Sequence, residues 1–339
     1  MQILKNPAHP FVDKRLASVD SFASRTVAPR RLGDPVVTVE LLATLDALLW
    51  LRTGERAAGY LQCTQSTVSR HSRRCLEVFG LRMEKRAGEW CLLGDPTLLN
   101  LQRGVHQFLR WQQGTGLRLD GQHWCRHLLE PGLPVPWVSG NGNYFEYERP
   151  LALLQEGVID AWLCSAPDLP EHPDLHTVQL TAMPMRLVVK PGHPLLARPA
   201  PLHLDDLADY PVLPLPEGAF PRAQAVLESL GLWSCPRRDH RLRQAAWFGQ
   251  VPVEELMIAF DTPLRLAAGH SEGWVPLPLD LPLVVGEALV VRRAFAASPH
   301  LRTLLEGLRQ RASQLAQGLR DVQLLEPPLA SVAAGLNPV

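Results

Sequence analysis

Residues 53–79 have the sequence TGERAAGYLQCTQSTVSRHSRRCLEVF, in which two helix signals stand on either side of a tight break at Gln62-Cys63. Thr53 is placed to cap a short first helix, because a threonine hydroxyl accepts a hydrogen bond from an amide of the first turn. Thr64 is placed to cap a second helix over Gln65–Phe79 in the same way. The pattern therefore predicts a helix-turn-helix.

The second helix has two chemically different faces at the period of an α-helix. Val68, Cys75 and Phe79 form an apolar stripe that includes Ser72, and we expect the Ser72 hydroxyl to bond back to the carbonyl of Val68. The opposite face carries hydroxyls and arginines, which contact phosphates and base edges in a major groove. The predicted DNA-binding residues on it are Gln65, Ser66, Thr67, Ser69, Arg70, Arg73 and Arg74. Charge alone fits a solvated surface helix equally well.

The formal net charge of the 339-residue chain is zero, but the charges are unevenly distributed. Residues 1–113 carry sixteen Lys and Arg against ten Asp and Glu, so the remaining residues carry a net charge of −6. A basic N-terminal third suggests that a polyanion partner, if there is one, meets this part of the chain.

A longer pattern around the second helix adds a family resemblance. Ala57-Ala58, Leu61 and Thr64-Gln65-Ser66 are followed in register by Val68-Ser69-Arg70, then by Gly80-Leu81-Arg82-Met83 and Arg86. This pattern resembles the LysR-type transcriptional regulators. The resemblance implies a winged helix-turn-helix over residues 36–95 that binds double-stranded promoter DNA, with Gln65, Ser66, Thr67, Ser69 and Arg70 at the family's contact positions. Arg86, within the matched pattern, is a further predicted DNA-binding residue. Glu89 lies at the expected wing tip, where an acidic side chain would repel phosphate.

Residues 96–115 predict a further helix with a narrow apolar seam. Leu98, Leu101, Val105 and Phe108 recur at spacings of three and four, which suits pairing with another helix. Packing within the same chain fits this periodicity equally well. In the resembled family this position holds a long linker helix that forms a dimer contact, so the resemblance implies a homodimer or homotetramer.

Beyond residue 116, short apolar runs alternate with helical stretches, which indicates an α/β domain with a mainly parallel sheet. The predicted strands are 136–139, 159–164, 185–190, 211–215, 256–260 and 288–291, and the predicted helices are 150–156, 204–208, 221–230 and 299–317. Residues 151–161, 188–195 and 204–211 resemble the LysR effector domain. The resemblance implies a fold like that of periplasmic binding proteins, with two α/β lobes and a cleft for a small-molecule effector.

Ligands in such clefts bind near strand ends, loops and helix N-termini. The candidate effector-binding residues in those places are Gly121, Asn141, Asn143, Gly218 and Phe220. Ordinary turn chemistry explains the glycines and asparagines equally well, because these residues are common in turns.

The sequence also excludes several classes of protein. It has no Ser-His-Asp, HExxH, GxGxxG or P-loop pattern, so we expect neither an enzyme nor a bound cofactor or metal. The six cysteines lack metal or redox spacing and are expected to fill the core. No apolar run approaches the roughly 18 residues of a membrane helix. The charged N-terminal residues argue against a secretory signal, so we expect a cytoplasmic protein with no membrane partner.

The predicted organisation is a flexible arm over residues 1–35, a winged helix-turn-helix over 36–95, a linker helix over 96–115, an effector domain over 116–317 and a tail over 318–339. The predicted function is that of a sequence-specific transcriptional regulator under the control of a small molecule. The alternative is a constitutive DNA-binding protein whose α/β domain only oligomerises. The two hypotheses differ in whether the C-terminal cleft binds a ligand.

Overall fold

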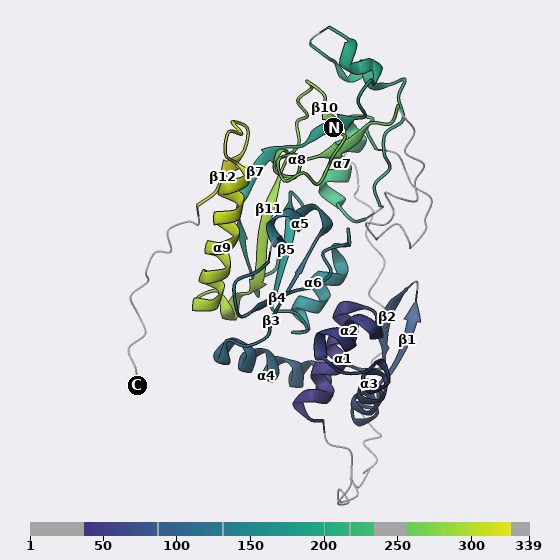
Figure 1. Cartoon of the computed structure of the whole chain (residues 1–339). Coiled ribbons are helices and arrows are strands. Elements are labelled where there is room, and N and C mark those ends of the chain that lie inside the picture. The colour runs from purple at the N-terminus through teal and green to yellow at the C-terminus, as the bar shows by residue number, and fades with distance from the viewer. Residues whose placement is uncertain are drawn as a thin grey trace, which may run out of the picture. The chain divides into compact units, whose positions relative to one another are not determined.

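The computed structural model describes residues 37–326, except 87, 131, 200, 217 and 234–255. Helices and a β-hairpin form its N-terminal part, and a mixed α/β fold forms the rest (Figure 1). The predicted arm and residues 327–339 of the predicted tail lie outside the described residues. Within that tail, Gln323–Leu324 forms a short strand, β12, which pairs with β7 (Thr181–Pro184). No described helix is long and apolar enough to span a membrane.

The N-terminal part contains the predicted pair of helices. It consists of α1 (Val39–Leu51), α2 (Gly54–Leu61), α3 (Gln65–Phe79), β1 (Arg82–Arg86) and β2 (Glu89–Leu93). Thr53 accepts a hydrogen bond from the amide of Arg56, and Thr64 accepts one from the amide of Thr67, at 3.3 and 3.2 Å. Both predicted caps are therefore confirmed. Leucines of α1 pack against α3 to form the core of this part.

The predicted linker helix is α4 (Thr97–Gln113), and only three residues separate it from the first strand of the α/β part, β3 (Leu117–Gly121). One face of α4 is buried through Leu99, Arg103, Gln107 and Trp111. Arg110 of α4 makes a bidentate ion pair with Asp160, with N···O distances of 2.9 and 3.0 Å. Charged and apolar contacts thus hold α4 along the α/β part of its own chain.

A seven-stranded sheet is the centre of the α/β part. Its strands beyond β3, β7 and β12 are β4 (Trp137–Ser139), β5 (Ala161–Ala166), β6 (Leu175–Gln179) and β11 (Val284–Arg292). Among the described pairs, only β3–β4 and β3–β5 are parallel, whereas β11 runs antiparallel to β5, β6 and β7. The prediction of a mainly parallel sheet is wrong because β11 returns from a second lobe and enters the sheet in the opposite direction.

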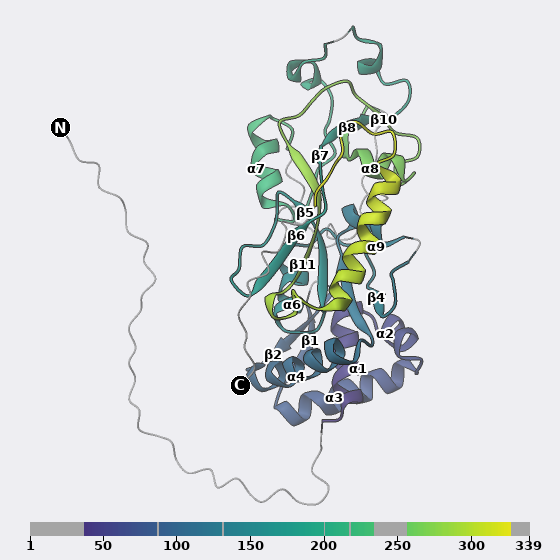
Figure 2. The same cartoon turned by 90° about the vertical axis from the view of Figure 1, so that its left-hand side faces the viewer.

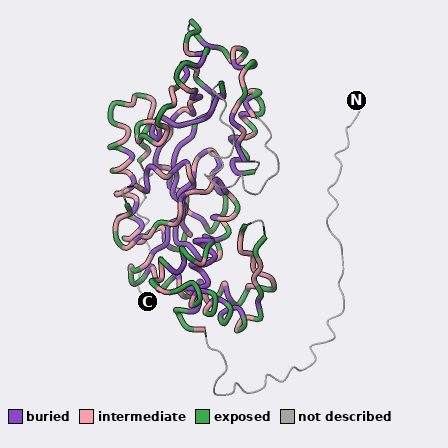
Figure 3. The backbone as a smooth tube through the Cα atoms, turned by 45° about the vertical axis from the view of Figure 1, so that its right-hand side comes forward, coloured by how far each residue is buried: buried purple, intermediate pink, exposed green. Residues whose placement is uncertain are grey.

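Helices cover both faces of this sheet (Figure 2). Helices α5 (Arg126–Leu129) and α9 (Pro299–Leu315) lie on one face, and α6 (Glu148–Gln155) lies on the other. Successive residues of β5 point to opposite faces, so that Leu163 belongs to one core cluster and Trp162 to the other. Figure 3 shows the resulting buried core along the strands.

The second lobe contains β8 (Arg186–Val189), β9 (Ala259–Asp261), β10 (Val275–Pro276), α7 (Pro221–Ser229) and α8 (Pro263–Ala267). Strand β8 lies between the other two. The predicted strand at 211–215 contributes one bridge, between Val212 and Ile258. The predicted helix at 204–208 is a 3-10 turn over Leu204–Leu207.

Candidate functional site

Helix α3 presents a continuous polar face. Gln65, Ser66, Ser69 and Arg70 are exposed, and Thr67 is half-buried beside the cap. The Thr64 hydroxyl lies 2.8 Å from that of Ser66 and 3.0 Å from that of Thr67. Arg73 and Arg74, one turn further on, are also exposed. The short side chains at the N-terminal end leave the backbone accessible to a close partner, while the arginines carry the positive charge.

The arginines of this face differ in their surroundings. Arg70, Arg73 and Arg74 make no ion pair with another described residue, so their charges are available to an external anion. Arg86, at the end of β1, pairs instead with Glu84 on the same strand. An exposed pair of this kind is weak and can be exchanged for a phosphate contact.

Glu89 does not face the surface that α3 presents. It is the first residue of β2, and its side chain is only 18% exposed. Its carboxylate pairs with Arg52, which follows α1, and with Arg149 of α6 at 3.4 Å. The negative charge is thus neutralised within the chain, which removes the repulsion of phosphate that the sequence suggested.

Ser72 lies in the buried face of α3 between Val68 and Cys75. Its hydroxyl is buried and has no hydrogen-bond partner among the described residues, so the predicted bond to the Val68 carbonyl is wrong. In an α-helix that carbonyl already accepts a bond from the amide of residue 72. Ser72 is also among the residues that line an open groove of about 610 Å³ between α3 and the hairpin.

Replacing Ser72 by alanine is expected to raise the free energy of unfolding by about 1 kcal/mol, because a buried hydroxyl without a partner carries its full desolvation cost. Chemical denaturation of the purified protein measures this change. Ser69→Ala is the matched control, because Ser69 is exposed on the same helix and its replacement should have almost no effect. A loss of stability in Ser72→Ala would contradict the assignment.

The four residues of the predicted seam on α4 are all exposed. The exposed fractions are 66% for Leu98, 64% for Leu101, 64% for Val105 and 55% for Phe108. They lie opposite the buried face of α4, and only Phe108 has a ring contact within the described chain, with Phe295 at 4.9 Å between the ring centres. Exposed apolar side chains of this size in one stripe are typical of a contact with another chain.

The five predicted effector-binding residues do not lie together. Gly121 is buried, where an added Cβ atom would come within 2.9 Å of Leu129. The half-buried Asn141 and Asn143 hydrogen bond to each other at 2.9 Å. Gly218 is exposed, and Phe220 is buried in the core of the second lobe. None of these residues lines the pocket described next.

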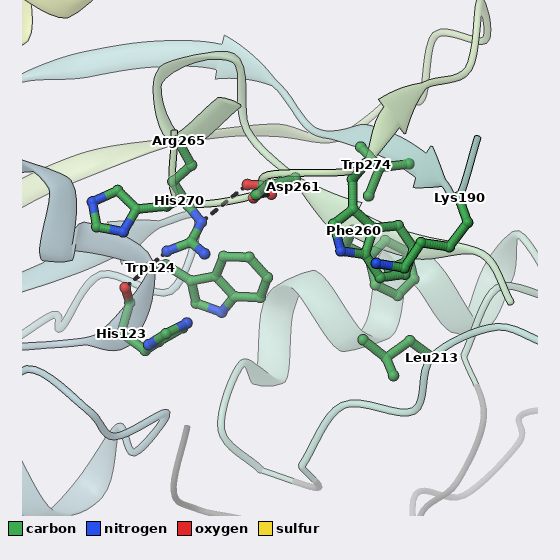
Figure 4. Close-up of a pocket in the computed structure, with 12 residues that line it drawn as sticks. His123, Trp124, Lys190, Leu213, Phe260, Asp261, Arg265, His270 and Trp274 are labelled. Atoms are coloured by element: carbon green, nitrogen blue, oxygen red, sulfur yellow. Dashed lines mark hydrogen bonds and ion pairs between the residues drawn. The ribbon is translucent and has the colours of Figure 1, made fainter. Parts of the chain in front are cut away.

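A pocket of about 410 Å³ lies between the first lobe, which is built on the seven-stranded sheet, and the second lobe (Figure 4). His123 and Trp124, which follow β3, line it from the first lobe. Lys190, Arg265 and Trp274 line it from the second lobe, together with residues of β9. The volume is within the range of small-molecule sites, and the walls combine indole rings with a few charged groups.

The charges of this pocket are unevenly compensated. Arg265 pairs with Asp261 at 3.0 Å and donates to the carbonyl of His123 at 3.1 Å, so its charge is largely satisfied (Figure 4). Burial, with the nearby positive charge of Arg265, lowers the pKa of His123 to about 3, so its imidazole is neutral. The ammonium of Lys190 lies 4.3 Å from the centre of the Trp274 ring and has no carboxylate partner among the described residues.

The cysteines that are buried fill the core as predicted. Burial raises the pKa of the Cys75 thiol to about 12 and also raises those of Cys125 and Cys164. Thiols held in the protonated form react slowly with oxidants. Within the part of the chain that the structure describes, no cluster of His, Cys, Asp and Glu could hold a metal ion.

The roles of several arginine and lysine side chains in these sites could not be predicted from the sequence pattern. Arg52 follows α1 in the left-handed region with φ 67°, a conformation that non-glycine residues rarely adopt. Lys190 ends the predicted strand 185–190, whereas Arg149 and Arg265 lie outside every predicted helix and strand. Arg149 contacts Glu89, Lys190 contacts Trp274 and Arg265 contacts the His123 carbonyl, and these partners are too far away in the sequence for spacing to reveal them.

The comparisons with known proteins agree with this arrangement. The family model of the LysR substrate binding domain matches residues 145–313. A full-length OxyR variant from Pseudomonas aeruginosa is 17% identical with a TM-score of 0.50, covering 81% of this chain and 98% of that one. A full-length BenM variant is 18% identical with a TM-score of 0.45, covering 86% of this chain and 99% of that one. No curated protein sequence matches the chain at a significant level.

The order of the elements agrees with the family match: helices and a hairpin come first, and the LysR substrate-binding domain follows. The chain thus has the architecture of a LysR-type transcriptional regulator, a family of non-enzymatic proteins with a DNA-binding helix-turn-helix and an effector-binding domain.

Proposed function

We propose that this regulator reads promoter DNA with α3, pairs with a second copy through α4, and binds a small organic anion in the pocket beside Lys190. The observation that carries the proposal is the exposure of two different surfaces on neighbouring helices. One is the polar face of α3, and the other is the apolar seam of α4. A protein that neither bound DNA nor oligomerised would not need to expose both of these surfaces. The cytoplasm, where promoter DNA is accessible, is the proposed location.

The exposed side chains at the start of α3 suit a major groove. In helix-turn-helix proteins the N-terminal residues of the second helix contact base edges, and arginine makes the commonest specific contact, to guanine. Gln65, Ser69 and Arg70 occupy these positions. Arg73 and Arg74 lie further along the helix, where we assign them to the phosphate backbone.

Arg70→Ala is expected to weaken binding to the specific operator by about 1–3 kcal/mol. The operator is first isolated by repeated selection of genomic fragments bound by the wild-type protein, and dissociation constants are then measured at fixed salt. Arg302→Ala is the control, since Arg302 is an exposed arginine of α9 outside the proposed DNA surface. An Arg70 variant that binds as tightly as wild type would refute α3 as the reading helix.

The pocket favours a flat ligand with a negative group. Indole rings of Trp124 and Trp274 provide apolar walls, and the imidazole of His123 provides no charge. The uncompensated ammonium of Lys190 is then the group that an anion would approach. A planar aromatic carboxylate has both features.

Wild-type protein is expected to bind 2-naphthoate at least tenfold more tightly than the uncharged 2-naphthamide, as measured by calorimetry. Lys190→Met should remove this preference, because the difference reflects one charge-assisted hydrogen bond. Lys85→Met is the matched control, because the Lys85 ammonium also lies over an indole ring, at 5.5 Å from the centre of Trp90. Equal affinity of the wild type for both probes would refute the proposal that the pocket binds an anion. If the wild type bound neither probe, the alternative of a constitutive DNA-binding protein whose α/β domain only oligomerises would be favoured.

A further inference from the structure

The DNA-binding part and the first lobe share one hydrophobic core. Trp50 and Leu51, at the end of α1, are buried in the same cluster as Leu153, Leu154 and Trp162 of the α/β part. The fit is close at the loop after β4, where a Cβ atom added to Gly140 would come within 2.7 Å of the Trp50 indole nitrogen. Movement of this loop would therefore act directly on α1.

Arg52 is the charged centre of this contact. Its guanidinium is 4% exposed, lies 2.6 Å from Glu146, pairs with Glu89 and stacks 3.4 Å from the centre of the Tyr144 ring. Burial alone would lower the pKa of Arg52, but the charges of Glu146 and Glu89 outweigh it and raise that pKa. Arg52 therefore stays charged and holds both carboxylates.

The segment 144–146 also touches the wall of the effector pocket. The amide of His123 donates to the carbonyl of Tyr144 at 2.8 Å, and the side-chain amide of Gln122 donates to the carbonyl of Glu146 at 3.1 Å. The Phe145 ring is centred 5.1 Å from that of His123 and 6.1 Å from that of Trp124. Three consecutive residues thus contact the pocket wall on one side and Arg52 on the other.

Arg52 and Arg149 connect segment 144–146 and α6 to the hairpin through hydrogen bonds and an ion pair. The Arg52 carbonyl accepts a hydrogen bond from the Trp90 indole at 2.9 Å. Arg149 donates to the carbonyls of Trp90 and Leu49 at 3.1 and 2.8 Å, and pairs with Glu89. The first two residues of β2 are therefore anchored to the effector domain of their own chain.

We infer that occupancy of the pocket changes operator affinity within a single chain, through segment 144–146, Arg52 and the start of β2. This inference rests on the proposed function, since it assigns a route between the proposed pocket and the proposed DNA surface. A ligand that displaces Trp124 or His123 would move Phe145, and the ion pair of Glu146 with Arg52 would transmit that shift to the hairpin and to α1.

A pocket-filling substitution tests this route without a known effector. Ser271 lines the pocket in a half-buried turn, so Ser271→Trp places an indole ring inside it. Operator dissociation constants are measured for wild type, Ser271→Trp, Glu146→Gln and the double variant. We expect Ser271→Trp to change the constant at least fivefold in the wild-type background, a typical size for allosteric coupling. In the Glu146→Gln background the change should fall below twofold.

Glu148→Gln is the matched control, because Glu148 is an exposed carboxylate two residues further on and should leave the effect of Ser271→Trp unchanged. Equal effects of Ser271→Trp with and without Glu146 would overturn the inference, and so would no effect in the wild-type background. Either result leaves the proposed function standing if wild type binds its operator and discriminates 2-naphthoate from 2-naphthamide.

Amide hydrogen exchange provides a second test that needs no substitution in segment 144–146. Comparing wild type with Ser271→Trp, we expect altered amide exchange in β2 and at the end of α1. Unaltered exchange at both places would contradict the route even if Glu146→Gln proved too unstable to purify.

Discussion

Leu101→Asp is expected to convert the protein to a monomer and to lower operator affinity at least 100-fold. Leu101 lies in the middle of the exposed seam on α4, with Leu98 on one side and Val105 on the other. A carboxylate in the centre of an apolar helix pair would be buried without a partner, which costs several kcal/mol in each subunit. Because a single recognition helix rarely binds a specific site, loss of the pair removes the second set of DNA contacts.

Sedimentation equilibrium measures the mass, and the operator dissociation constant is measured on the same sample. Val284→Asp is the matched control: Val284 is 61% exposed, close to the 64% of Leu101, but lies on β11 outside α4. The control should keep both the mass and the affinity of the wild type. An unchanged mass for Leu101→Asp would show that the copies associate elsewhere or not at all.

Arg103→Met is expected to lower the free energy of unfolding by about 3–5 kcal/mol, because removal of one partner leaves a buried charge uncompensated. The Arg103 side chain is fully buried and lies 2.8 Å from Asp46 of α1 and 2.9 Å from Glu156 at the end of α6. It therefore connects α4 to both parts of the chain. After its removal the ion pair left to Asp46 among the described residues is that with Arg118, at 3.7 Å.

Chemical denaturation measures this loss, and the double variant Arg103→Met with Asp46→Leu provides the internal test. Since the second substitution removes the stranded carboxylate, it should recover most of the lost stability. A single variant with wild-type stability would show that Arg118 alone compensates Asp46. In that case Arg103 would not be needed to hold the two parts together.

The local structure of the N-terminal part could be predicted because its signals are local. Threonine caps and helical periodicity place α2 and α3 correctly, and spacing groups Leu98, Leu101, Val105 and Phe108 into one seam of α4, although it does not say whether that seam is exposed. Charge and hydroxyl composition identify the polar face of α3. Each of these signals involves residues within a few positions of one another, which is the range over which caps and helix faces act.

The sheet and the pocket could not be predicted in the same way. The direction of β11 depends on where the chain returns from the second lobe, and nothing within its apolar run specifies that direction. The pocket combines His123 with Lys190 and Arg265, which belong to distant segments. Glycines and asparagines in turns suggested a different set of residues, because turn composition reports backbone conformation and not the position of a cavity.

The amino-acid pattern alone accounts for the helix-turn-helix, the apolar seam of α4 and the resemblance to one family of regulators. Only the folded chain shows that Glu89 pairs inward with Arg52, and that Arg52 is shared with Glu146, 94 residues away. Buried charges must find partners wherever packing brings carboxylates and guanidinium groups together. Those partners are set by the tertiary fold, and they connect the proposed DNA surface to the proposed effector pocket.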